Sequence, residues 1–338
     1  MKSKVKILAV FLVIVIMGTL SGCTKSGQVS DNSSDSNSDS DLFPIRIITQ
    51  TSFNEINVAD ELGFFKDEGI KIEYTGVLGQ GVTEFQLIQQ GINDAFTGSH
   101  PPTVAQARLA GLKVKAVAPG MIDDPKYPHV NYLVKDGSGI NSLDDIVDKK
   151  VSISSTAPCN DGYLLYYLQK HSVSGKPQFI TLSTAGQQEQ SLNQGLVDVT
   201  TSHPPYAGKA LAAGGVHSIG TSWDILHSPG AGLSVRGFTE DFIAQHPKQV
   251  QGFVNALYKA RVWINAHPDE AIKIVAKYLK LEPSDLSLFK YDGDKNINPE
   301  YIKEWYTIAE DIGLWKHGDI SEDDVYTNQF VPNDYNPN

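Results

Sequence analysis

Short apolar, β-branched runs alternate with stretches whose apolar side chains recur at helical spacing. Runs of the first kind are typical of buried strands, and stretches of the second kind are typical of helices packed on a sheet. The expected strands are 45–49, 70–74, 95–97, 114–118, 132–134, 151–154, 178–182, 197–199 and 232–235. The expected helices are 54–66, 79–89, 99–109, 142–147, 158–170, 187–194, 247–279 and 299–312.

The alternation of strand and helix predicts an α/β protein with largely parallel sheets. It pauses and restarts near residue 131, and a chain of 338 residues is long enough for two domains. We therefore expect two α/β lobes. Ligands of such sheets bind beyond the carboxyl ends of the strands, so polar residues at those ends are the candidates for a binding site.

One tetrapeptide occurs at two of these strand ends, as Ser99–Pro102 and again as Ser202–Pro205. Both copies read Ser-His-Pro-Pro, and both run into an alanine-rich helical segment. Proline is well suited to the first position of a helix. We expect each lobe to present the same helix start to a shared cleft, where free N–H groups and the positive end of the helix dipole favour an anionic ligand group.

His100 and His203 are the central candidates, either as donors to a ligand or as residues that only cap their helices. A metal site would need further ligands, and Asp94 and Asp198 are expected to point into their own sheets. We therefore expect no metal and no cofactor. The other seven histidines are scattered and are expected at the surface.

Further candidates come from the remaining strand ends and from nearby aromatic residues. Phe53 and Trp223 are candidate cleft walls, Tyr163 can reach the cleft from its helix, and Arg236 fits either a salt bridge or an anion contact. The aromatic residues Trp263, Trp305 and Trp315 are expected in the core. The full set of expected ligand-binding residues is Ser52, Phe53, Gln80, Gly81, Ser99, His100, Ser155, Thr156, Ser202, His203 and Trp223.

The N-terminus has the pattern of an export signal. Three lysines precede the apolar run Ile7–Met17, which is shorter than the roughly 20 residues that span a bilayer. Leu20–Cys23 resembles the lipoprotein box of bacteria, which implies cleavage after residue 22 and a lipid on Cys23; a plain signal with an incidental cysteine is the alternative. Residues 24–41 are mostly Ser, Asp and Asn and are expected to form a flexible tether.

Charge and cysteine content narrow the class of protein. Removal of residues 1–22 changes the formal net charge from −11 to −14, which argues against a nucleic-acid partner. Cys23 and Cys159 are the only cysteines, so a lipid on Cys23 leaves no pair for a structural disulfide and no cysteine-rich metal site.

Four segments resemble landmarks of one family: Leu62–Ile70, Gly111–Ala118, Gly139–Asp145 and Lys149–Val151. The family comprises the solute-binding proteins of ABC importers for nitrate, taurine and alkanesulfonates, and includes binders of thiamine-pyrimidine precursors. The resemblance implies the type II periplasmic-binding-protein fold, with two α/β lobes, a two-crossing hinge near 131–134 and 230–235, and a ligand cleft between. The implied lobes are 44–131 plus 232–338 and 132–231, preceded by the signal 1–22 and the lipidated tether 23–43.

The function implied is capture of a small polar, anionic solute by lobe closure and its delivery to ABC permease subunits. The protein would be a monomer, anchored by lipid on the extracytoplasmic face of the cell membrane, and not an enzyme. Many family members carry Trp-Asp-Pro where this chain has Ser202–Pro205, so no particular ligand is implied.

Two alternatives remain open. One is an enzyme on the same fold, although the cysteine-rich iron motif of pyrimidine synthases and a Gly-x-Ser-x-Gly elbow are both absent from the sequence. The other is a receptor for a heterocycle or carboxylate that does not take part in transport.

Overall fold

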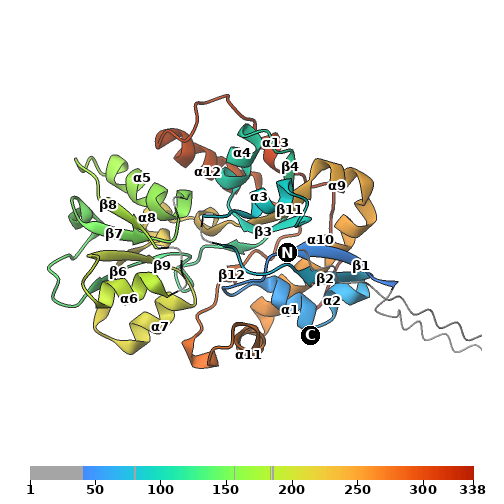
Figure 1. Ribbon diagram of the computed structural model, residues 1–338, viewed down its shortest axis with the longest axis horizontal. Coiled ribbons are helices and arrows are strands. Elements are labelled where there is room, and N and C mark those ends of the chain that lie inside the picture. Colours follow the sequence, from blue (N-terminus) through green and yellow to red (C-terminus); the bar gives the residue numbers. More distant parts are fainter. Residues whose placement is uncertain (1–40, 80, 156, 183, 185) are drawn as a thin grey trace, which may run out of the picture. The chain divides into compact units, whose positions relative to one another are not determined.

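The computed structural model describes residues 41–338 except residues 80, 156, 183 and 185 (Figure 1). The expected signal, Cys23 and the tether to residue 40 lie outside the described residues, as do Gln80 and Thr156. No helix of the described part is both long and apolar enough to cross a membrane.

The strands form two groups with the same internal order. In the first group β2 pairs with β1, β1 lies beside β3, and β11 lies between β3 and β4. The second sheet has the order β8-β7-β9-β6-β10. The strands of the first group are β1 (Phe43–Ile47), β2 (Ile70–Tyr74), β3 (Ala95–Ser99), β4 (Val114–Pro119) and β11 (Val235–Thr239). Those of the second sheet are β6 (Asn131–Lys135), β7 (Lys150–Ile153), β8 (Gln178–Thr181), β9 (Val199–Ser202) and β10 (Val216–Thr221).

The likeness of the two groups extends to individual hydrogen bonds. Asp94 accepts the backbone N–H of Arg46 at 2.8 Å and donates its own N–H to the Arg46 carbonyl at 2.9 Å. Asp198 makes the same two bonds with Lys150, at 2.8 and 2.9 Å. Both aspartates thus point into their own strand groups, as the sequence predicted.

Each group contains one strand that runs against its neighbours, so the sheets are less parallel than expected. β11 is antiparallel to β3 and β4, and β6 is antiparallel to β9 and β10. The reason lies in the connections. The chain leaves one group after β4 and the other after β10, and the next strand enters the opposite group at the edge where its neighbouring strands end, so it runs against them.

The two segments that make these connections, 120–130 and 222–234, lie side by side. The Asp123 N–H donates to Pro229 O at 2.8 Å, and the Ser234 N–H donates to Met121 O at 3.0 Å. A Cβ atom added at Gly232 would collide with the backbone of Asp123. The contact between the segments is therefore close enough to require glycine at this position. The first segment contains β5 (Met121–Ile122), which pairs with β12 (Lys290–Tyr291).

The helices cover the sheets and differ from the sequence expectation mainly at their ends. Gly63, with φ 74°, divides the helix expected over 54–66 into α1 and α2, and the helix expected from Gly79 begins only after Thr83. The helices before residue 214 are α1 (Glu55–Glu61), α2 (Phe64–Asp67), α3 (Glu84–Gln89), α4 (Pro101–Leu109), α5 (Tyr163–Lys170), α6 (Gln187–Asn193) and α7 (Tyr206–Ala213). Short helical turns are η2 (Leu143–Ile146), η3 (Pro158–Gly162), η4 (Pro229–Gly232) and η5 (Pro283–Asp285).

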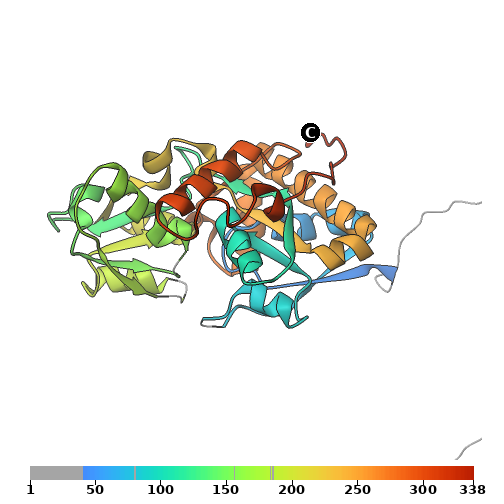
Figure 2. The same cartoon turned by 90° about the horizontal axis from the view of Figure 1, so that it is seen from above.

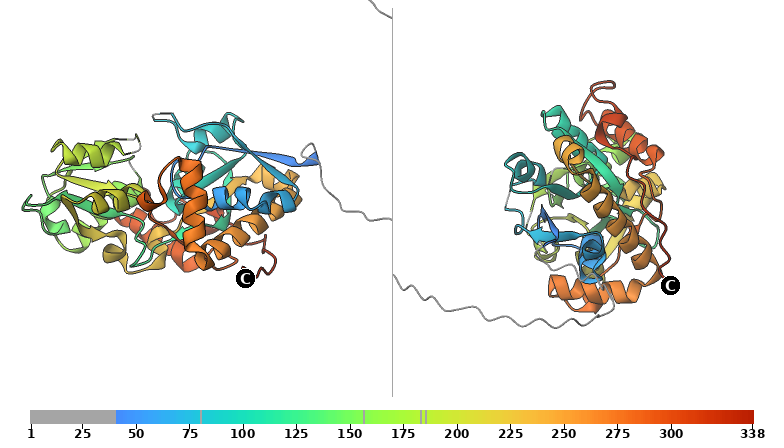
Figure 3. Two further views of the ribbon diagram at one scale, coloured as in Figure 1. Left: turned by 90° about the horizontal axis from the view of Figure 1, so that it is seen from below. Right: turned by 90° about the vertical axis from the view of Figure 1, so that its right-hand side faces the viewer.

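The C-terminal helices are α8 (Ser222–Leu226), α9 (Glu240–Gln245), α10 (Pro247–Ala266), α11 (Pro268–Leu279), α12 (Pro299–Asp311) and α13 (Glu322–Val325). α10 and α11 pack on α1 (Figure 3), and α12 contacts α4, η4, η3 and α5, so it touches elements that flank both strand groups (Figure 2). Asn298 caps α12 by accepting the Glu300 N–H at 3.0 Å, as its position before Pro299 predicted. Trp305 of α12 and Trp315 are buried, as expected, and Trp263 is partly buried.

Candidate functional site

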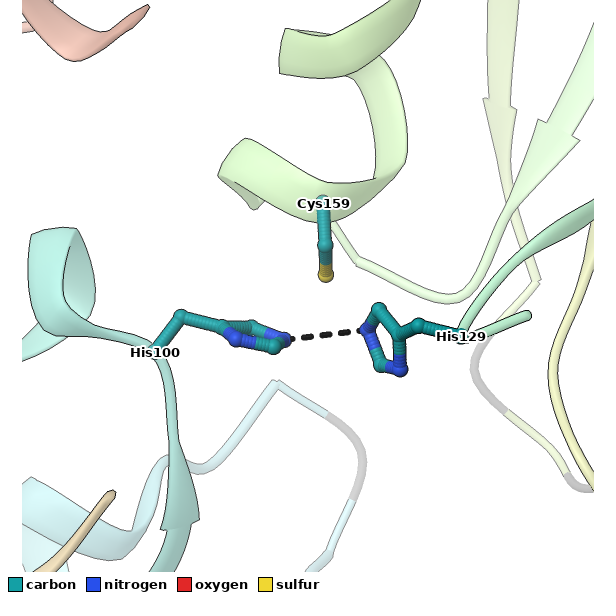
Figure 4. Close-up of side chains that lie close together, drawn as sticks. All are labelled: His100, His129 and Cys159. Atoms are coloured by element: carbon teal, nitrogen blue, oxygen red, sulfur yellow. Dashed lines mark hydrogen bonds between the residues drawn. The ribbon is translucent and has the colours of Figure 1, made fainter. Parts of the chain in front are cut away.

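Three histidines and a cysteine meet where the two connecting segments pass between the strand groups. His100 follows β3, His129 lies in the first connecting segment, His203 follows β9, and Cys159 lies on η3. The Nε2 atoms of His100 and His129 are 3.1 Å apart, and the Sγ atom of Cys159 points toward both rings (Figure 4). The ring of His203 lies 5.0 Å from that of His129, centroid to centroid. We call these four residues the histidine cluster.

Hydrogen bonding fixes the tautomer of His100. Its Nδ1 lies 2.7 Å from the backbone carbonyl of Leu233, and a carbonyl only accepts. Nδ1 therefore carries the proton, and Nε2 presents a lone pair to the cluster. The backbone N–H of His129 donates to Asp123 Oδ1 at 2.7 Å. The side-chain Nδ1 of His129 is buried without a hydrogen-bond partner among the described residues.

Burial keeps the cluster uncharged at neutral pH. Desolvation lowers the pKa of both His100 and His203 to about 4, and His100 further lowers that of His203. Desolvation also holds the pKa of His129 well below its ordinary value, with smaller effects from the two neighbouring histidines. The Cys159 thiol has its pKa raised to about 12, chiefly by burial and secondly by Asp161. The cluster thus offers neutral donors and lone pairs rather than charges.

A stack of aromatic rings supports the cluster from α12 and α5. Trp305 lies 4.8 Å from the ring of His100 on one side and 5.0 Å from that of Tyr163 on the other. Trp305 donates its indole N–H to Gly230 O at 2.8 Å, and Tyr163 donates its hydroxyl to Ala231 O. Tyr163 is fully buried and committed to this bond, so it fixes the second connecting segment instead of reaching a cleft.

The two tetrapeptides do not form the same helix start, because α4 begins at Pro101 whereas α7 begins at Tyr206, after both prolines of its copy. The start of α4 also offers fewer free N–H groups than expected. Pro101 and Pro102 occupy the first two positions of α4, and neither has an N–H. Thr103 and Val104 both donate to the His100 carbonyl, at 2.9 and 3.3 Å. His100 sits at the N-cap but forms no side-chain cap bond. The second proline therefore removes a donor that a single proline would have left for an anion, and the side chains of the cluster become the main polar groups.

Both copies of the tetrapeptide have a carboxylate beneath the preceding strand end. Glu84 accepts from the N–H and the hydroxyl of Thr97, at 2.9 and 2.6 Å, and Glu189 accepts from the hydroxyl of Ser202. Each glutamate precedes its hydroxyl partner by 13 positions. Desolvation raises the pKa of Glu84. These bonds use the Ser202 and Thr97 protons, so the two hydroxyl groups have only lone pairs left for other partners.

The other residues expected to bind ligand differ in their exposure to solvent. Phe53 is 2% exposed and packs against Tyr291 in the core, so it is not an open cleft wall in this structure. Ser52, Ser99 and Trp223 are partly buried, and Gly81 and Ser155 are exposed. Ser155 contributes its carbonyl as the acceptor for the Asn160 side chain at 2.8 Å. Among the expected residues that the structure describes, it brings together His100 and His203, through His129.

Arg236 is accounted for by an ion pair. Its Nη2 donates to Glu55 Oε2 at 2.9 Å, its Nη1 donates to Ser234 Oγ at 2.7 Å, and the Arg236 and Glu55 side chains are 2% and 0% exposed. Of the two roles open at the sequence level, the salt bridge is the one formed here.

His129 and Cys159 are the residues that sequence reasoning missed. His129 was expected at the surface, but it is 2% exposed and sits at the centre of the cluster. It stands one residue before the end of the first connecting segment, in Pro128-His129-Val130-Asn131, so its place beside the expected hinge was the available signal. Cys159 carried no signal, because nothing in its neighbourhood distinguishes it from a core residue.

Comparison with known proteins supports the fold. The aliphatic sulphonate binding protein SsuA of Escherichia coli has TM-score 0.65 and 19% identity, with 87% of this chain and 94% of that chain covered. The nitrate-binding protein NrtA of Synechocystis PCC 6803 has TM-score 0.68 and 13% identity, with coverage of 86% and 87%. The desulfurization enzyme DSZB has TM-score 0.61 and 16% identity, with coverage of 85% and 97%. The chain therefore has the two-lobed α/β fold of periplasmic binding proteins, which an enzyme shares.

No curated protein is similar enough in sequence to match this chain. A family model described as "NMT1/THI5 like" matches residues 50–271, which is more than half of the chain and includes every member of the histidine cluster. The chain therefore belongs to the NMT1/THI5-like family.

Proposed function

We propose that this protein is an extracytoplasmic solute-binding lipoprotein of an ABC importer, which captures a small polar solute by closure of its two lobes. One observation carries the proposal: the equivalent strands β3 and β9 are followed by His100 and His203, whose rings both lie within 5.0 Å of the ring of His129 in a connecting segment. A molecule held by both histidines favours the arrangement in which the groups are close together, and that coupling is the basis of ligand-driven closure.

The chemistry of the site indicates a ligand with hydrogen-bonding oxygen or nitrogen atoms. The histidines are neutral, and the Arg236 guanidinium is occupied by Glu55. An anionic ligand such as a sulfonate, taurine or nitrate would rely on the dipoles of α4 and α7 and on the imidazole N–H of His203, because the N–H of His100 is already bonded to Leu233 O. SsuA and NrtA, which have the same fold, are described as binding sulphonates and nitrate. Their names make these anions the first ligands to test.

The proposed cellular setting follows from the N-terminus. Lipid on Cys23 would anchor the protein on the extracytoplasmic face of the cell membrane, and the acidic Ser-rich tether would let it reach permease subunits of an importer. We propose that it acts as a monomer, with lobe 2 formed by residues 132–231 and lobe 1 by residues 44–131 and 232–338.

Isothermal titration of the purified protein tests the proposal. The panel is taurine, alkanesulfonates, nitrate, small carboxylates and pyrimidines, with each solute also titrated against His100→Ala and His203→Ala. His317→Ala, at a side chain that is 93% exposed, is the matched control. We expect one solute class to bind with a stoichiometry of one and to lose affinity in both cluster variants only. A folded protein that binds nothing in the panel would contradict the assignment.

An enzyme on this fold is the second candidate, because DSZB shares the fold. The environment of Cys159 opposes nucleophilic catalysis, since burial raises its pKa to about 12 and thiolate is the reactive form. Mass spectrometry of each solute after prolonged incubation with the protein distinguishes the two functions. A binding protein returns the solute unchanged, whereas an enzyme accumulates product.

A further inference from the structure

We propose that His100, His129 and Cys159 form a binding site for one divalent late transition-metal ion, such as Zn²⁺. This inference goes beyond solute capture and can be tested without any solute. The site would join three elements that are distant in sequence: the start of α4, the first connecting segment and η3.

The three side chains offer the ligand atoms that such ions prefer. One nitrogen from each of the two histidines and the sulfur of Cys159 all lie within 4.8 Å of one another. They point toward a common centre from three sides (Figure 4). Imidazole nitrogen and cysteine sulfur are the usual ligands of Zn²⁺, and a mixed set of this kind disfavours Mg²⁺ and Ca²⁺, which take oxygen ligands.

The spacing of the nitrogen atoms fits one ion. Two nitrogens bound to Zn²⁺ at about 2.0–2.1 Å with a tetrahedral angle between them are roughly 3.3 Å apart. The observed Nε2–Nε2 distance between His100 and His129 is 3.1 Å. The sulfur must approach each nitrogen to roughly 3.5 Å in such a site, so a rotation of the Cys159 side chain or a small movement of η3 completes the set.

The hydrogen bonds of His100 already have the pattern of a metal ligand. A ligating histidine commonly donates its other ring N–H to a carbonyl or carboxylate, which orients the ring and fixes the free lone pair. His100 donates Nδ1–H to Leu233 O at 2.7 Å and directs the Nε2 lone pair at the cluster. His129 then binds the ion through Nε2, with its proton on Nδ1.

A plain hydrogen bond between the two imidazoles is the competing explanation. In that arrangement His129 Nε2–H donates to His100 Nε2, and His129 Nδ1 has no hydrogen-bond partner among the described residues with or without a metal. It gives no role to the sulfur that faces both rings. With a metal, both Nε2 lone pairs and the thiolate bind one centre, and the thiol proton leaves for solvent on binding.

The charges near the cluster suit a dication. A divalent ion with one thiolate leaves one positive charge in a buried place, which is costly without a counter-charge. Asp123 is 1% exposed, is bonded to the His129 backbone N–H, and has one carboxylate oxygen without a hydrogen-bond partner among residues described. Its carboxylate, six positions before His129 in the same connecting segment, is the candidate counter-charge for the ion. His203 or a solvent molecule can supply the fourth ligand, since the His203 ring lies 5.0 Å from that of His129.

Titration of the reduced full chain with Co²⁺ tests the site, using protein purified without a histidine tag. We expect one equivalent to give a thiolate-to-cobalt charge-transfer band and tetrahedral ligand-field bands, and Zn²⁺ to remove both. Cys159→Ser should abolish the charge-transfer band, while Cys23→Ser, at the only other cysteine, should leave it unchanged. His100→Asn and His129→Asn should each weaken binding at least about 100-fold, and the exposed His317→Asn should have no effect.

A measurement on the wild-type protein tests the same metal site without relying on the folding of any variant. X-ray absorption at the zinc edge of the wild-type protein should show one sulfur at about 2.3 Å and nitrogen at about 2.0–2.1 Å. Uptake of much less than one equivalent, a spectrum without sulfur, or a charge-transfer band that persists in Cys159→Ser would overturn the proposal. Solute titrations run with a chelator present show separately whether the protein binds its solute without the ion.

Discussion

The buried ion pair between Arg236 and Glu55 gives a prediction that separates a structural role from an anion-binding one. Arg236→Met leaves the Glu55 carboxylate without its partner in a place where neither side chain is more than 2% exposed. Solvent cannot screen or rehydrate the stranded charge there. Removal of one partner from such a pair costs about 3–5 kcal/mol of unfolding free energy.

The second variant in the series is Glu55→Gln combined with Arg236→Met. It removes both charges, and we expect it to recover most of the lost stability, because replacing a buried pair as a whole is often nearly neutral. Lys277→Met is the control: its pair with Glu61 is short, at 2.6 Å, but the lysine is 67% exposed. A change below about 1 kcal/mol is expected at that exposed position.

Thermal unfolding followed by circular dichroism measures the effect. A loss of about 3–5 kcal/mol lowers the midpoint of a chain this long by about 5–8 °C. Solute affinity of the folded double variant should equal that of the wild type. The reasoning is refuted if Arg236→Met unfolds at the wild-type temperature. If instead the double variant is stable but loses solute binding, Arg236 contacts the ligand.

Four further predictions follow from other parts of the molecule. His100→Ala and His203→Ala should each lower solute affinity about tenfold or more, the cost of one lost hydrogen bond at a buried site, with unchanged circular dichroism; unchanged affinity in both would reduce the tetrapeptides to helix starts. Burial raises the pKa of Asp60, which accepts from Tyr74 and Tyr278, so its ionisation in the folded state opposes stability as pH rises through that pKa. Asp60→Asn should therefore raise the thermal midpoint at pH 7, and the gain should shrink as pH falls below about 4; an equal gain at both pH values would point to another cause. Gly232→Ala should destabilise the protein by about 1–3 kcal/mol, because its Cβ meets the Asp123 backbone, whereas Gly98→Ala meets nothing within 4 Å and should be tolerated, as urea unfolding of both would show. Cys23→Ser should release the protein from membranes into the soluble fraction of cells that carry out lipoprotein processing, and a variant that stays in the membrane fraction would exclude the lipid anchor.

The positions of most strands and helices could be predicted from the sequence, because burial on a sheet imposes short β-branched runs and helical periodicity. The strand at 70–74 has the expected bounds, and α10 through α12 fall within the expected helical stretches. Helix ends were harder to predict. Gly63 closes α1 through a left-handed backbone conformation, so the single helix expected over 54–66 is two helices.

The repeat of Ser-His-Pro-Pro was itself determined by the sequence, and so was its place at two strand ends. The contacts that the two histidines of the repeat make are decided by the tertiary structure. The connecting segments place His129 between the two copies and Leu233 O against His100, at a separation of 133 residues along the chain. Local patterns cannot report such contacts, since they depend on how β6 and β11 cross into opposite strand groups. For the same reason a cysteine on η3 meets two histidines, and with the partly buried His203 they form one neutral cluster.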